Sequence, residues 1–474
     1  MKLTWRKFLA PRSMAVVGVS RREDDYVNHF VRTMLDYGFK GRLYLVNPRE
    51  REILGFKCYP SVLDVEDEVD LAFIAVPGEA VSKVLEDCGR KGVKAVIVFS
   101  SDSDYLSPTG DRGIGRAIAD AVAKWGFKVI GPNCLGIYRP SQGMCFAHSF
   151  PREPGDVAFL AQSGGHAAAM GWLGASIGLR FSAIVSYGNA VDVDLPELVE
   201  AFSEDPETKV VAAYVEGVKD GRRLVKALMK ASQRMPMVVW KGGVSKAGAE
   251  AVATHTLALA GSWRVWEAAL RKTGAVVTWG LEDTAYTCLT LSLRPQLKGR
   301  RLATVSISGG EGVSTADALS HAKLELARLS ERTLEALKKL VPRYGSSIKN
   351  PVDIQLAALE PEALRGVVEA LLEDPGVDGV LVSQSMEWPI YYRGRGRFME
   401  LVEALRQARR EVGGALFVAM QPRLHYEAFK EAQAKLLEAG IPVYPSVEQA
   451  ARCIAKLAQV NPLNNQERGS PELS

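Results

Sequence analysis

The sequence lacks the features that mark several large classes of protein. No apolar run approaches the about 20 residues of a membrane-spanning helix, and the first ten residues hold too short an apolar stretch for a signal peptide. The six cysteines form no C-x-x-C pair, so neither a disulfide framework nor a zinc knuckle is indicated. The net charge of +4 is spread along the chain without a basic run that would bind nucleic acid or an anionic membrane. We therefore expect a soluble protein of the reducing cytoplasm.

Two glycine-rich signatures of nucleotide binding are also missing. The chain has no G-x-G-x-x-G, the turn that lets a backbone approach a dinucleotide pyrophosphate. It has no G-x-x-x-x-G-K-[ST] either, the loop whose N–H groups and lysine hold ATP phosphates. These absences disfavour a typical dehydrogenase and a P-loop enzyme.

What is present is an ordinary globular composition in a long chain. The 474 residues are 47% hydrophobic and 24% charged, and their number is about three times the usual ~150 residues of a single domain. Short β-branched runs alternate with longer amphipathic segments, which is typical of an α/β fold with parallel sheets. The expected strands lie at 14–18, 43–47, 71–76, 95–100, 128–130, then 156–161, 181–186, 210–215, 237–241, 275–278, and finally 302–308, 379–383, 416–420 and 443–444.

The strands fall into three series, separated by a loop sequence at 139–143 and a polar stretch at 294–301. We therefore expect three α/β domains in tandem followed by a polar tail without apolar periodicity. The predicted ranges are 1–140 for a Rossmann-like domain, 141–295 and 296–460 for two further domains, and 461–474 for a flexible tail.

The first domain carries a candidate nucleotide site. Its first strand runs into Gly18-Val-Ser20, a tight turn that would place N–H groups and a hydroxyl near a phosphate. The second strand ends in Asn47-Pro-Arg49 and not in the acidic residue that holds an NAD ribose. An arginine there suits a phosphorylated ribose, as in coenzyme A or NADP. The alternative is a glycine needed only for the turn and an arginine on a solvated rim.

Further strand ends of this domain carry Val76-Pro77 and Gly-Pro-Asn133-Cys-Leu-Gly. Ligands of open parallel sheets lie beyond the carboxyl ends of the strands, where both segments would sit. The Val-Pro pair could offer an apolar wall and a carbonyl to an adenine. The alternative for each segment is a simple turn.

Two strand–glycine–helix junctions are candidate phosphate sites. Ser163-Gly164-Gly165 opens a helix in the second domain, and Gly309-Gly310 opens one in the third. Free N–H groups and the helix dipole stabilise anions at such helix starts. Alternatively, the glycines only permit tight turns.

A candidate nucleophile lies between these junctions. His255 sits in a segment, Lys241 to Ser262, so rich in Gly and Ala that few large side chains could pack on it. Imidazole is a good nucleophile toward phosphorus near neutral pH. Glu216, at a strand end, could accept the Nδ1–H and leave Nε2 to attack; its alternative role is a solvated or capping residue. We treat the other histidines as bystanders, His166 least securely because it follows Ser163-Gly-Gly.

In their order along the chain, these motifs resemble the α subunits of ADP-forming acyl-CoA synthetases, relatives of succinyl-CoA synthetase. The motifs are Gly18-Val-Ser, Val46-Asn-Pro-Arg, Val76-Pro, Gly131-Pro-Asn-Cys-Leu-Gly, Gln162-Ser-Gly-Gly, Tyr187-Gly-Asn-Ala-Val-Asp, Tyr214-Val-Glu-Gly, Thr254-His-Thr, Ala260-Gly-Ser and Lys349-Asn-Pro-Val-Asp. The resemblance implies a CoA-binding Rossmann-like domain followed by two flavodoxin-like ligase domains. It also implies the reaction acyl-CoA + ADP + phosphate ⇌ acid + CoA + ATP, through an acyl phosphate and a phosphohistidine.

The resemblance assigns roles to individual residues. His255 matches the phosphorylated histidine, Glu216 the glutamate that steadies it, and 163–165 with 309–310 the helix ends that hold phosphate. The positions that match the coenzyme A site are Gly18, Ser20, Asn47, Arg49, Val76, Pro77, Ser100 and Asn133. No metal site is implied on this chain. ADP or ATP, with Mg²⁺, is expected on an ATP-grasp β subunit in a hetero-oligomer of the α₂β₂ type.

The sequence departs from the family pattern in three places. Ser100 to Tyr105 replaces a usual Gly-Phe-x-Glu stretch, Tyr26-Val-Asn replaces a region where glycine is common, and Leu257 replaces a glycine after the histidine. Two competing interpretations therefore stay open: a non-catalytic or divergent acyl-CoA-binding regulatory paralogue, and an NADP oxidoreductase. The acid substrate is not identified by the sequence.

Overall fold

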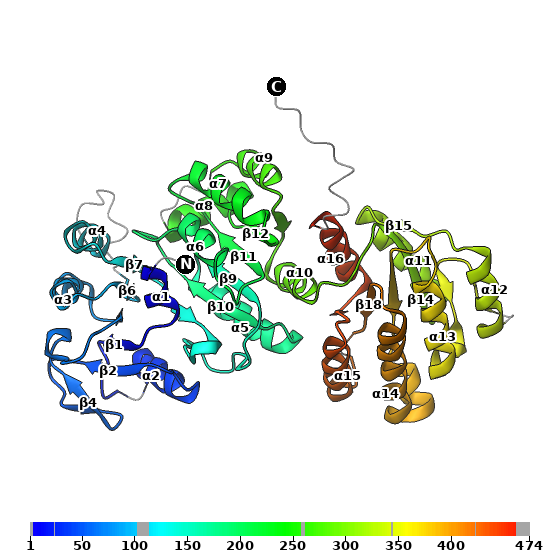
Figure 1. Cartoon of the computed structure of the whole chain (residues 1–474), viewed down its shortest axis with the longest axis horizontal. Coiled ribbons are helices and arrows are strands. Elements are labelled where there is room, and N and C mark those ends of the chain that lie inside the picture. The colour runs from blue at the N-terminus through cyan, green and yellow to red at the C-terminus, as the bar shows by residue number, and fades with distance from the viewer. Residues whose placement is uncertain are drawn as a thin grey trace. The chain divides into compact units, whose positions relative to one another are not determined.

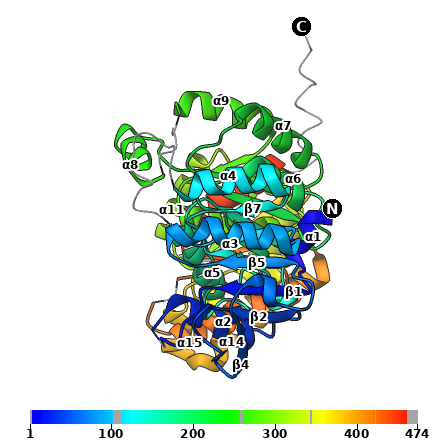
Figure 2. The same cartoon turned by 90° about the vertical axis from the view of Figure 1, so that its left-hand side faces the viewer.

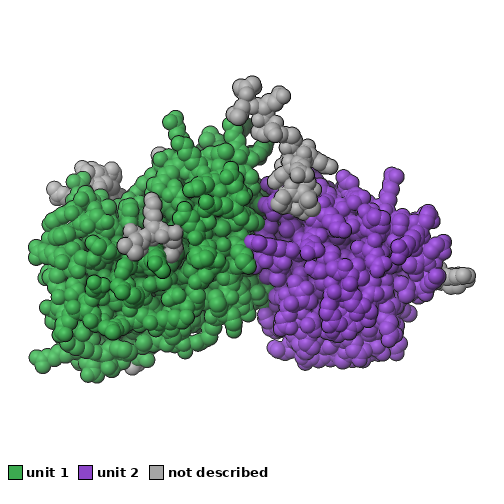
Figure 3. Space-filling model, viewed as in Figure 1, with its two compact units in different colours: residues 1–285 green, residues 286–474 purple. Residues whose placement is uncertain are grey.

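A computed structural model describes residues 3–22, 24–101, 113–256, 261–342, 345–421 and 423–460; the side chains of residues 3–4 and 253–256 are not described. The chain divides into two compact units, residues 1–285 and 286–474 (Figure 3). Unit 1 holds two sheets and unit 2 a third, and most of their strands are parallel, which confirms the α/β fold class (Figure 1). The domain borders at 140, 295 and 460 stay predictions, and the predicted tail, 461–474, lies outside the described residues.

The first sheet of unit 1 has the strand order β3-β4-β2-β1-β5-β6-β7. Its strands are β1 (Ser13–Val17), β2 (Arg42–Val46), β3 (Glu52–Ile53), β4 (Phe56–Tyr59), β5 (Leu71–Ile74), β6 (Ala95–Val98) and β7 (Lys128–Ile130). Among the described strands of this sheet, β3 alone runs antiparallel, to β4. Since the chain order reverses between β1 and β5, the crevice beyond these two strand ends is where such a sheet binds ligands.

Helices cover both faces of this sheet, so its short Val/Ile-rich strands are buried on both sides. The helices are α1 (Leu3–Leu9), α2 (Tyr26–Asp36), α3 (Gly78–Lys91) and α4 (Ile114–Trp125). Figure 2 shows α3 and α4 side by side over one face, where Val81, Leu85 and Ile118 pack on the strands. Both helices end at a left-handed glycine, Gly92 and Gly126, the usual C-terminal stop.

The second sheet of unit 1 has the order β13-β12-β11-β9-β10-β8, with β8 antiparallel to β10. Its strands are β8 (Gly136–Tyr138), β9 (Val157–Ala161), β10 (Phe181–Ser186), β11 (Val210–Val215), β12 (Met237–Lys241) and β13 (Val276–Thr278). The accompanying helices are α5 (Gly164–Ile177), α6 (Leu195–Phe202), α7 (Gly221–Ser232), α8 (Lys246–Thr256) and α9 (Trp263–Thr273). Helix α10 (Leu281–Leu293) crosses the border between the units.

The two sheets of unit 1 are joined by backbone hydrogen bonds. Asn189, Val191 and Val193 donate from their N–H groups to carbonyls at Pro132, Gly131 and Val129, over 2.9–3.1 Å. The segment 189–193 therefore runs along the outer edge of β7 and brings the loop after β10 next to the loop 131–133.

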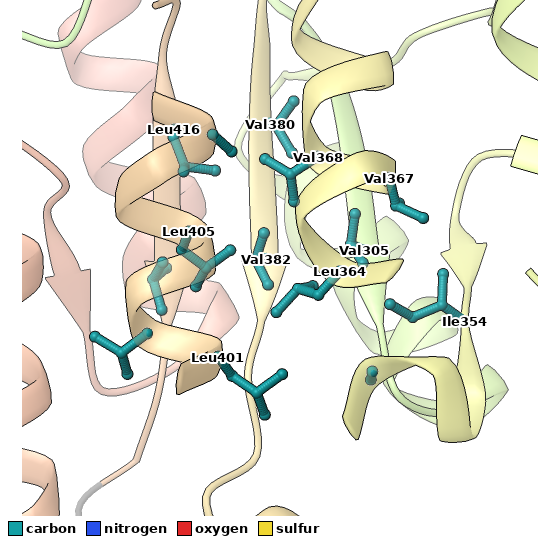
Figure 4. Close-up of a cluster of buried hydrophobic side chains, with 14 of the residues drawn as sticks. Val305, Ile354, Leu364, Val367, Val368, Val380, Val382, Leu401, Leu405 and Leu416 are labelled. Atoms are coloured by element: carbon teal, nitrogen blue, oxygen red, sulfur yellow. The ribbon is translucent and has the colours of Figure 1, made fainter. Parts of the chain in front are cut away.

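Unit 2 is built on a parallel sheet of order β15-β14-β17-β18-β19, with β16 also paired to β14. The strands are β14 (Arg301–Ser306), β15 (Glu325–Leu326), β16 (Val352–Asp353), β17 (Gly379–Ser383), β18 (Leu416–Ala419) and β19 (Val443–Tyr444). The helices are α11 (Gly309–His321), α12 (Glu331–Leu340), α13 (Pro361–Leu372), α14 (Glu387–Val412, broken at Gly394), α15 (Tyr426–Glu438) and α16 (Val447–Val460). Figure 4 shows Val380 and Val382 of β17 between Leu364 of α13 and Leu405 of α14.

None of the described helices is long and apolar enough to cross a membrane.

Candidate active site

The turn after β1 brings three strand ends together. Gly18 has φ +104°, and a Cβ at this position would lie 2.1 Å from the carbonyl oxygen of Ala75 at the end of β5. Its N–H donates to Val46 O at the end of β2, over 3.0 Å. Only glycine fits this close approach, so the predicted tight turn is built as the Gly18-Val-Ser motif indicates.

Asn47 ties the neighbouring turn to the same place. Its Nδ2 donates to Val19 O at 2.7 Å, and its Oδ1 accepts from the backbone N–H of Arg49 at 2.8 Å. The amide of Asn47 is therefore used to shape the turn. Arg49 is exposed, and its side chain makes no ion pair within the described part of the chain. Its guanidinium can therefore meet a phosphorylated ribose.

Ser20 lies in the turn after β1, as the sequence predicts, but its hydroxyl is bound to a carboxylate. The Ser20 hydroxyl donates to Asp25 Oδ2 at 2.6 Å, and Asp25 Oδ1 accepts from Val27 N at 3.1 Å as the N-cap of α2. A side-chain anion thus occupies the helix start that a phosphate would use. The next residue, Tyr26, stacks on Phe99 with ring centroids 4.6 Å apart. This stack is formed by the first residue of the Tyr26-Val-Asn stretch, which stands in a region where glycine is common.

Ser100 connects the ends of β5, β6 and β7. Its hydroxyl donates to Val76 O at 2.5 Å and accepts from Val76 N at 3.1 Å. Its carbonyl accepts from the N–H of Asn133, which has the left-handed φ of +58°. Pro77 then leads into α3 at its N-cap. Residues 102–105 of the altered stretch Ser100 to Tyr105 lie outside the described residues.

The second sheet presents the predicted phosphate motif at the carboxyl end of β9. Ser163 is the N-cap of α5, and its hydroxyl accepts from the backbone N–H of His166 at 3.3 Å. Gly164 and Gly165 are the first two helical residues, and Gly165 is exposed. The N-terminal turn of α5 therefore opens at the surface as an anion site requires.

Glu216 lies one strand away, at the end of β11, and is only 4% exposed. The phenol of Tyr214 donates to Glu216 Oε1 at 3.0 Å. The side-chain oxygen of Gln162 accepts from the backbone N–H groups of Glu216 and Gly217, at 2.8 and 3.2 Å. Glu216 is therefore a buried, held carboxylate, and not the solvated surface residue of the alternative interpretation.

A buried lysine completes this cluster. Lys241, at the end of β12, is 4% exposed, and its Nζ donates to Glu216 O at 2.8 Å and also to Gly242 O. Its ammonium lies 5.2 Å from the ring centroid of Trp266. Burial lowers the pKa of Lys241 to about 8, against a smaller raising effect of Glu216.

Three roles at this site were not predicted from the sequence. Gln162, Tyr214 and Lys241 stand inside the quoted motifs, but no function was given to them. Each lies at or next to a strand end, which is the signal that could have found them. His166, treated as a bystander, stacks on the Tyr214 ring with centroids 4.3 Å apart and so belongs to the site.

The predicted nucleophile lies partly outside the described residues. The backbone of His255 belongs to α8, which follows β12 through Gly242-Gly243, but its side chain is not described, and Leu257 lies wholly outside the description. The pairing of His255 with Glu216 therefore stays a prediction. Glu216 directly follows β11, and α8 follows β12, the neighbouring strand of the same sheet.

In unit 2, Gly309 and Gly310 are the first residues of α11, with Ser308 as the N-cap. Beside them is a cavity of about 280 Å³ at the carboxyl edge of the sheet, lined in part by Gly310, Glu311, Ser383 and Arg423. The Ser383 hydroxyl lies 3.5 Å from Glu311 Oε2, and burial raises the pKa of this carboxyl. The helix start thus holds a half-buried carboxyl group next to the predicted phosphate position.

Comparison with known proteins defines the class of the chain. Residues 12–140 match the CoA binding domain, and residues 154–291 match the succinyl-CoA ligase like flavodoxin domain. The first match lies within unit 1 and contains its first sheet, and the second contains β9 to β13 and ends inside α10, just beyond the border of unit 1. The fold and these matches define a subunit of an acid–thiol ligase.

The α subunit of ADP-forming acetate–CoA ligase I from Pyrococcus furiosus is 35% identical over 456 residues, covering 94% of this chain and 96% of that one. The ADP-forming acetate–CoA ligase I of Archaeoglobus fulgidus is 34% identical over 466 residues, covering 98% of this chain but 64% of that longer protein. Acetyl-coenzyme A synthetase 1 of Candidatus Korarchaeum cryptofilum, solved with phosphate and ADP, matches with a TM-score of 0.86 at 29% identity and covers 99% of both chains. The chain therefore belongs to the family of ADP-forming acetate–CoA ligase α subunits.

This membership confirms the resemblance inferred from the ordered motifs. It also contradicts the alternative interpretation as an NADP oxidoreductase, since the relatives are acid–thiol ligases.

Proposed function

We propose that this chain catalyses the acyl half of an ADP-forming acyl-CoA synthetase reaction, with His255 as the phosphoryl carrier. The observation that carries the proposal is the buried Glu216, held beside the N-terminal turn of α5 by Gln162 and Tyr214. Glutamates are rarely buried, and a buried carboxylate that is held by hydrogen bonds at a strand end is typical of a functional site.

The reaction follows from these groups in three steps. An oxygen of inorganic phosphate attacks the thioester carbonyl, the carbon–sulfur bond breaks, and coenzyme A leaves as the thiol while an acyl phosphate forms. Nε2 of His255 then attacks phosphorus, and the carboxylate leaves. Glu216 accepts the Nδ1–H and stabilises the phosphoimidazole, and the N-terminal N–H groups of α5 hold the phosphoryl oxygens. Finally, the phosphoryl group passes to ADP.

The first sheet supplies the coenzyme A site in this proposal. The Gly18 turn gives the close backbone approach that a nucleotide requires, and the exposed Arg49 faces no carboxylate within the described residues. Because Asp25 already caps α2, we place the 3′-phosphate of coenzyme A at Arg49 and not at the start of that helix. Val76, Pro77, Ser100 and Asn133 form the neighbouring wall.

The nucleotide half of the reaction belongs to a partner subunit. Two relatives are named as α subunits, and about a third of the length of the Archaeoglobus fulgidus ligase lies outside the region that this chain matches. We therefore propose that an ATP-grasp β subunit binds ADP or ATP with Mg²⁺, and that the assembly is α₂β₂. The segment with His255 would carry the phosphoryl group between the subunits.

The substrate is proposed as a small carboxylic acid, with acetate to be tested first in view of the names of the relatives. Ala167 and Ala168, after the phosphate motif, are small and leave the chain length of the acid undefined. Six cysteines that form no disulfide fit the cytoplasm, in which we place the enzyme.

The test is labelling of the whole chain with acetyl-CoA and radioactive phosphate. We expect an acid-labile, alkali-stable label, as a phosphoramidate gives, and its loss in His255→Asn. Full labelling of His255→Asn would show that another residue, such as His166, carries the phosphoryl group. Binding of coenzyme A without labelling of the wild type would favour the non-catalytic acyl-CoA-binding alternative.

A further inference from the structure

The phenol of Tyr214 holds the carboxylate of Glu216 in one orientation. The two residues are two positions apart at the end of β11, so their side chains lie on the same face of the sheet. The Tyr214 hydroxyl donates to Glu216 Oε1 at 3.0 Å, and both groups are buried. Burial and the neighbouring Glu216 carboxylate raise the pKa of Tyr214, so the phenol stays a donor at neutral pH.

Two rings fix the Tyr214 phenol in turn. His166 of α5 stacks on it, with centroids 4.3 Å apart and planes inclined by 23°. Trp240, its register partner on β12, meets it at a centroid distance of 4.6 Å and packs edge-on to His166. A phenol held on two sides loses little further freedom when it binds a carboxylate.

The backbone of Glu216 is fixed independently. Its N–H donates to Gln162 and its carbonyl accepts from Lys241. The remaining freedom of the residue lies in its side-chain torsions, and the hydrogen bond from Tyr214 restrains the end of that chain.

We propose that Tyr214 is a positioning residue of the phosphoryl-transfer site, which orients the Glu216 carboxylate for the imidazole of His255. This inference rests on the proposed function. Hydrogen-bonded partners of a catalytic carboxylate fix its geometry, so the imidazole meets an acceptor that needs no reorganisation. His166 contributes by clamping the Tyr214 ring, and not by chemistry of its own.

Gly242 provides an independent way to disturb the same bond. A Cβ at this position would lie 2.6 Å from the Tyr214 hydroxyl and 3.0 Å from Cζ. Gly242→Ala should therefore push the phenol away from Glu216 without changing either residue.

The experiment measures the rate of acid-labile labelling of the full chain by acetyl-CoA and phosphate. The labelling rate of Tyr214→Phe should be about tenfold lower than that of the wild type, as expected for the loss of a hydrogen bond to a charged group. The acetyl-CoA concentration that gives half of the maximal rate should not change. Gly242→Ala should reproduce the slowing. The matched control is Tyr138→Phe, which removes the hydrogen bond of another buried phenol, to Pro151 O, on the same sheet; it should label at the wild-type rate.

A double-mutant comparison distinguishes positioning from a general loss of structure. If Tyr214 acts through Glu216, Tyr214→Phe combined with Glu216→Gln should be no slower than Glu216→Gln alone. The inference would be overturned if the double variant were slower by the product of the two single effects, or if Tyr214→Phe labelled at the wild-type rate. A wild-type chain that takes no label would instead overturn the proposed function.

Discussion

The hydroxyl of Ser20 donates to the carboxylate of Asp25 over 2.6 Å, at the N-terminal end of α2. A fixed negative charge therefore stands next to the Gly18 turn, at which we propose that coenzyme A binds. Asp25 stabilises α2 as its N-cap and at the same time repels any phosphate that approaches the helix start.

Asp25→Asn should consequently bind coenzyme A several-fold more tightly, because asparagine keeps the N-cap hydrogen bond but removes the charge. Isothermal titration of the whole chain with coenzyme A measures the change. Asp24→Asn is the matched control, since Asp24 is exposed and paired only with Arg22 among the described contacts. Equal affinities of wild type and Asp25→Asn would show that the phosphates pass this carboxylate at a distance.

Arg49→Ala should weaken coenzyme A more than dephospho-coenzyme A. The guanidinium is exposed, and in the proposed site it makes a charge-assisted contact with the 3′-phosphate that dephospho-coenzyme A lacks, so we expect about a tenfold difference between the two ligands. Arg51→Ala, two residues along the same exposed turn, serves as the control. An equal loss for both ligands would place the 3′-phosphate elsewhere.

Lys241 should make the free energy of unfolding of unit 1 depend on pH in the alkaline range. Its folded pKa of about 8 lies below the ordinary 10.5, so between these values the unfolded chain keeps a proton that the folded chain has released. The free energy of unfolding therefore gains a contribution that increases with pH across this window. Lys241→Met should remove that contribution, which is read as the difference between wild-type and variant melting temperatures from pH 7.5 to 10.5. A constant difference would contradict the assignment.

Glu311 should make the stability of unit 2 depend on pH in the opposite direction. Burial raises its folded pKa above the ordinary 4.5, so the folded state binds the proton more tightly and stability is lost as pH rises through the folded value. Glu311→Gln should flatten this part of the stability curve. Glu448→Gln, an exposed carboxylate of the same cavity, should leave it unchanged. If both variants behave alike, the raised pKa of Glu311 is not the cause.

The sequence predicted the parts of the fold and site that depend on local pattern. The strands of all three series lie close to their predicted positions, because buried parallel strands are short β-branched runs bounded by glycines and turns. Gly18 was predicted as a tight-turn residue, and its φ of +104° agrees with that role. The roles of His255, Glu216 and the coenzyme A residues stay predictions.

Contacts between distant elements could not be predicted in this way. The stack of His166 on Tyr214 depends on the register of β11 with β12 and on how α5 crosses the sheet. The capping of α2 by Asp25 competes with phosphate for the same N–H groups, and a glycine pattern alone does not reveal such a competitor. Both features require the packed structure.

The hydrogen bonds that run from Asn189 to Val193 along β7 have a consequence for dissecting the protein. An exposed strand edge is a template for pairing with other chains, and this segment occupies that edge in the intact chain. A fragment ending near residue 145 would lose the cover and also the β10 partner of β8. We expect such a fragment to self-associate through its bare β7 edge, so the coenzyme A site is best studied in the uncut chain.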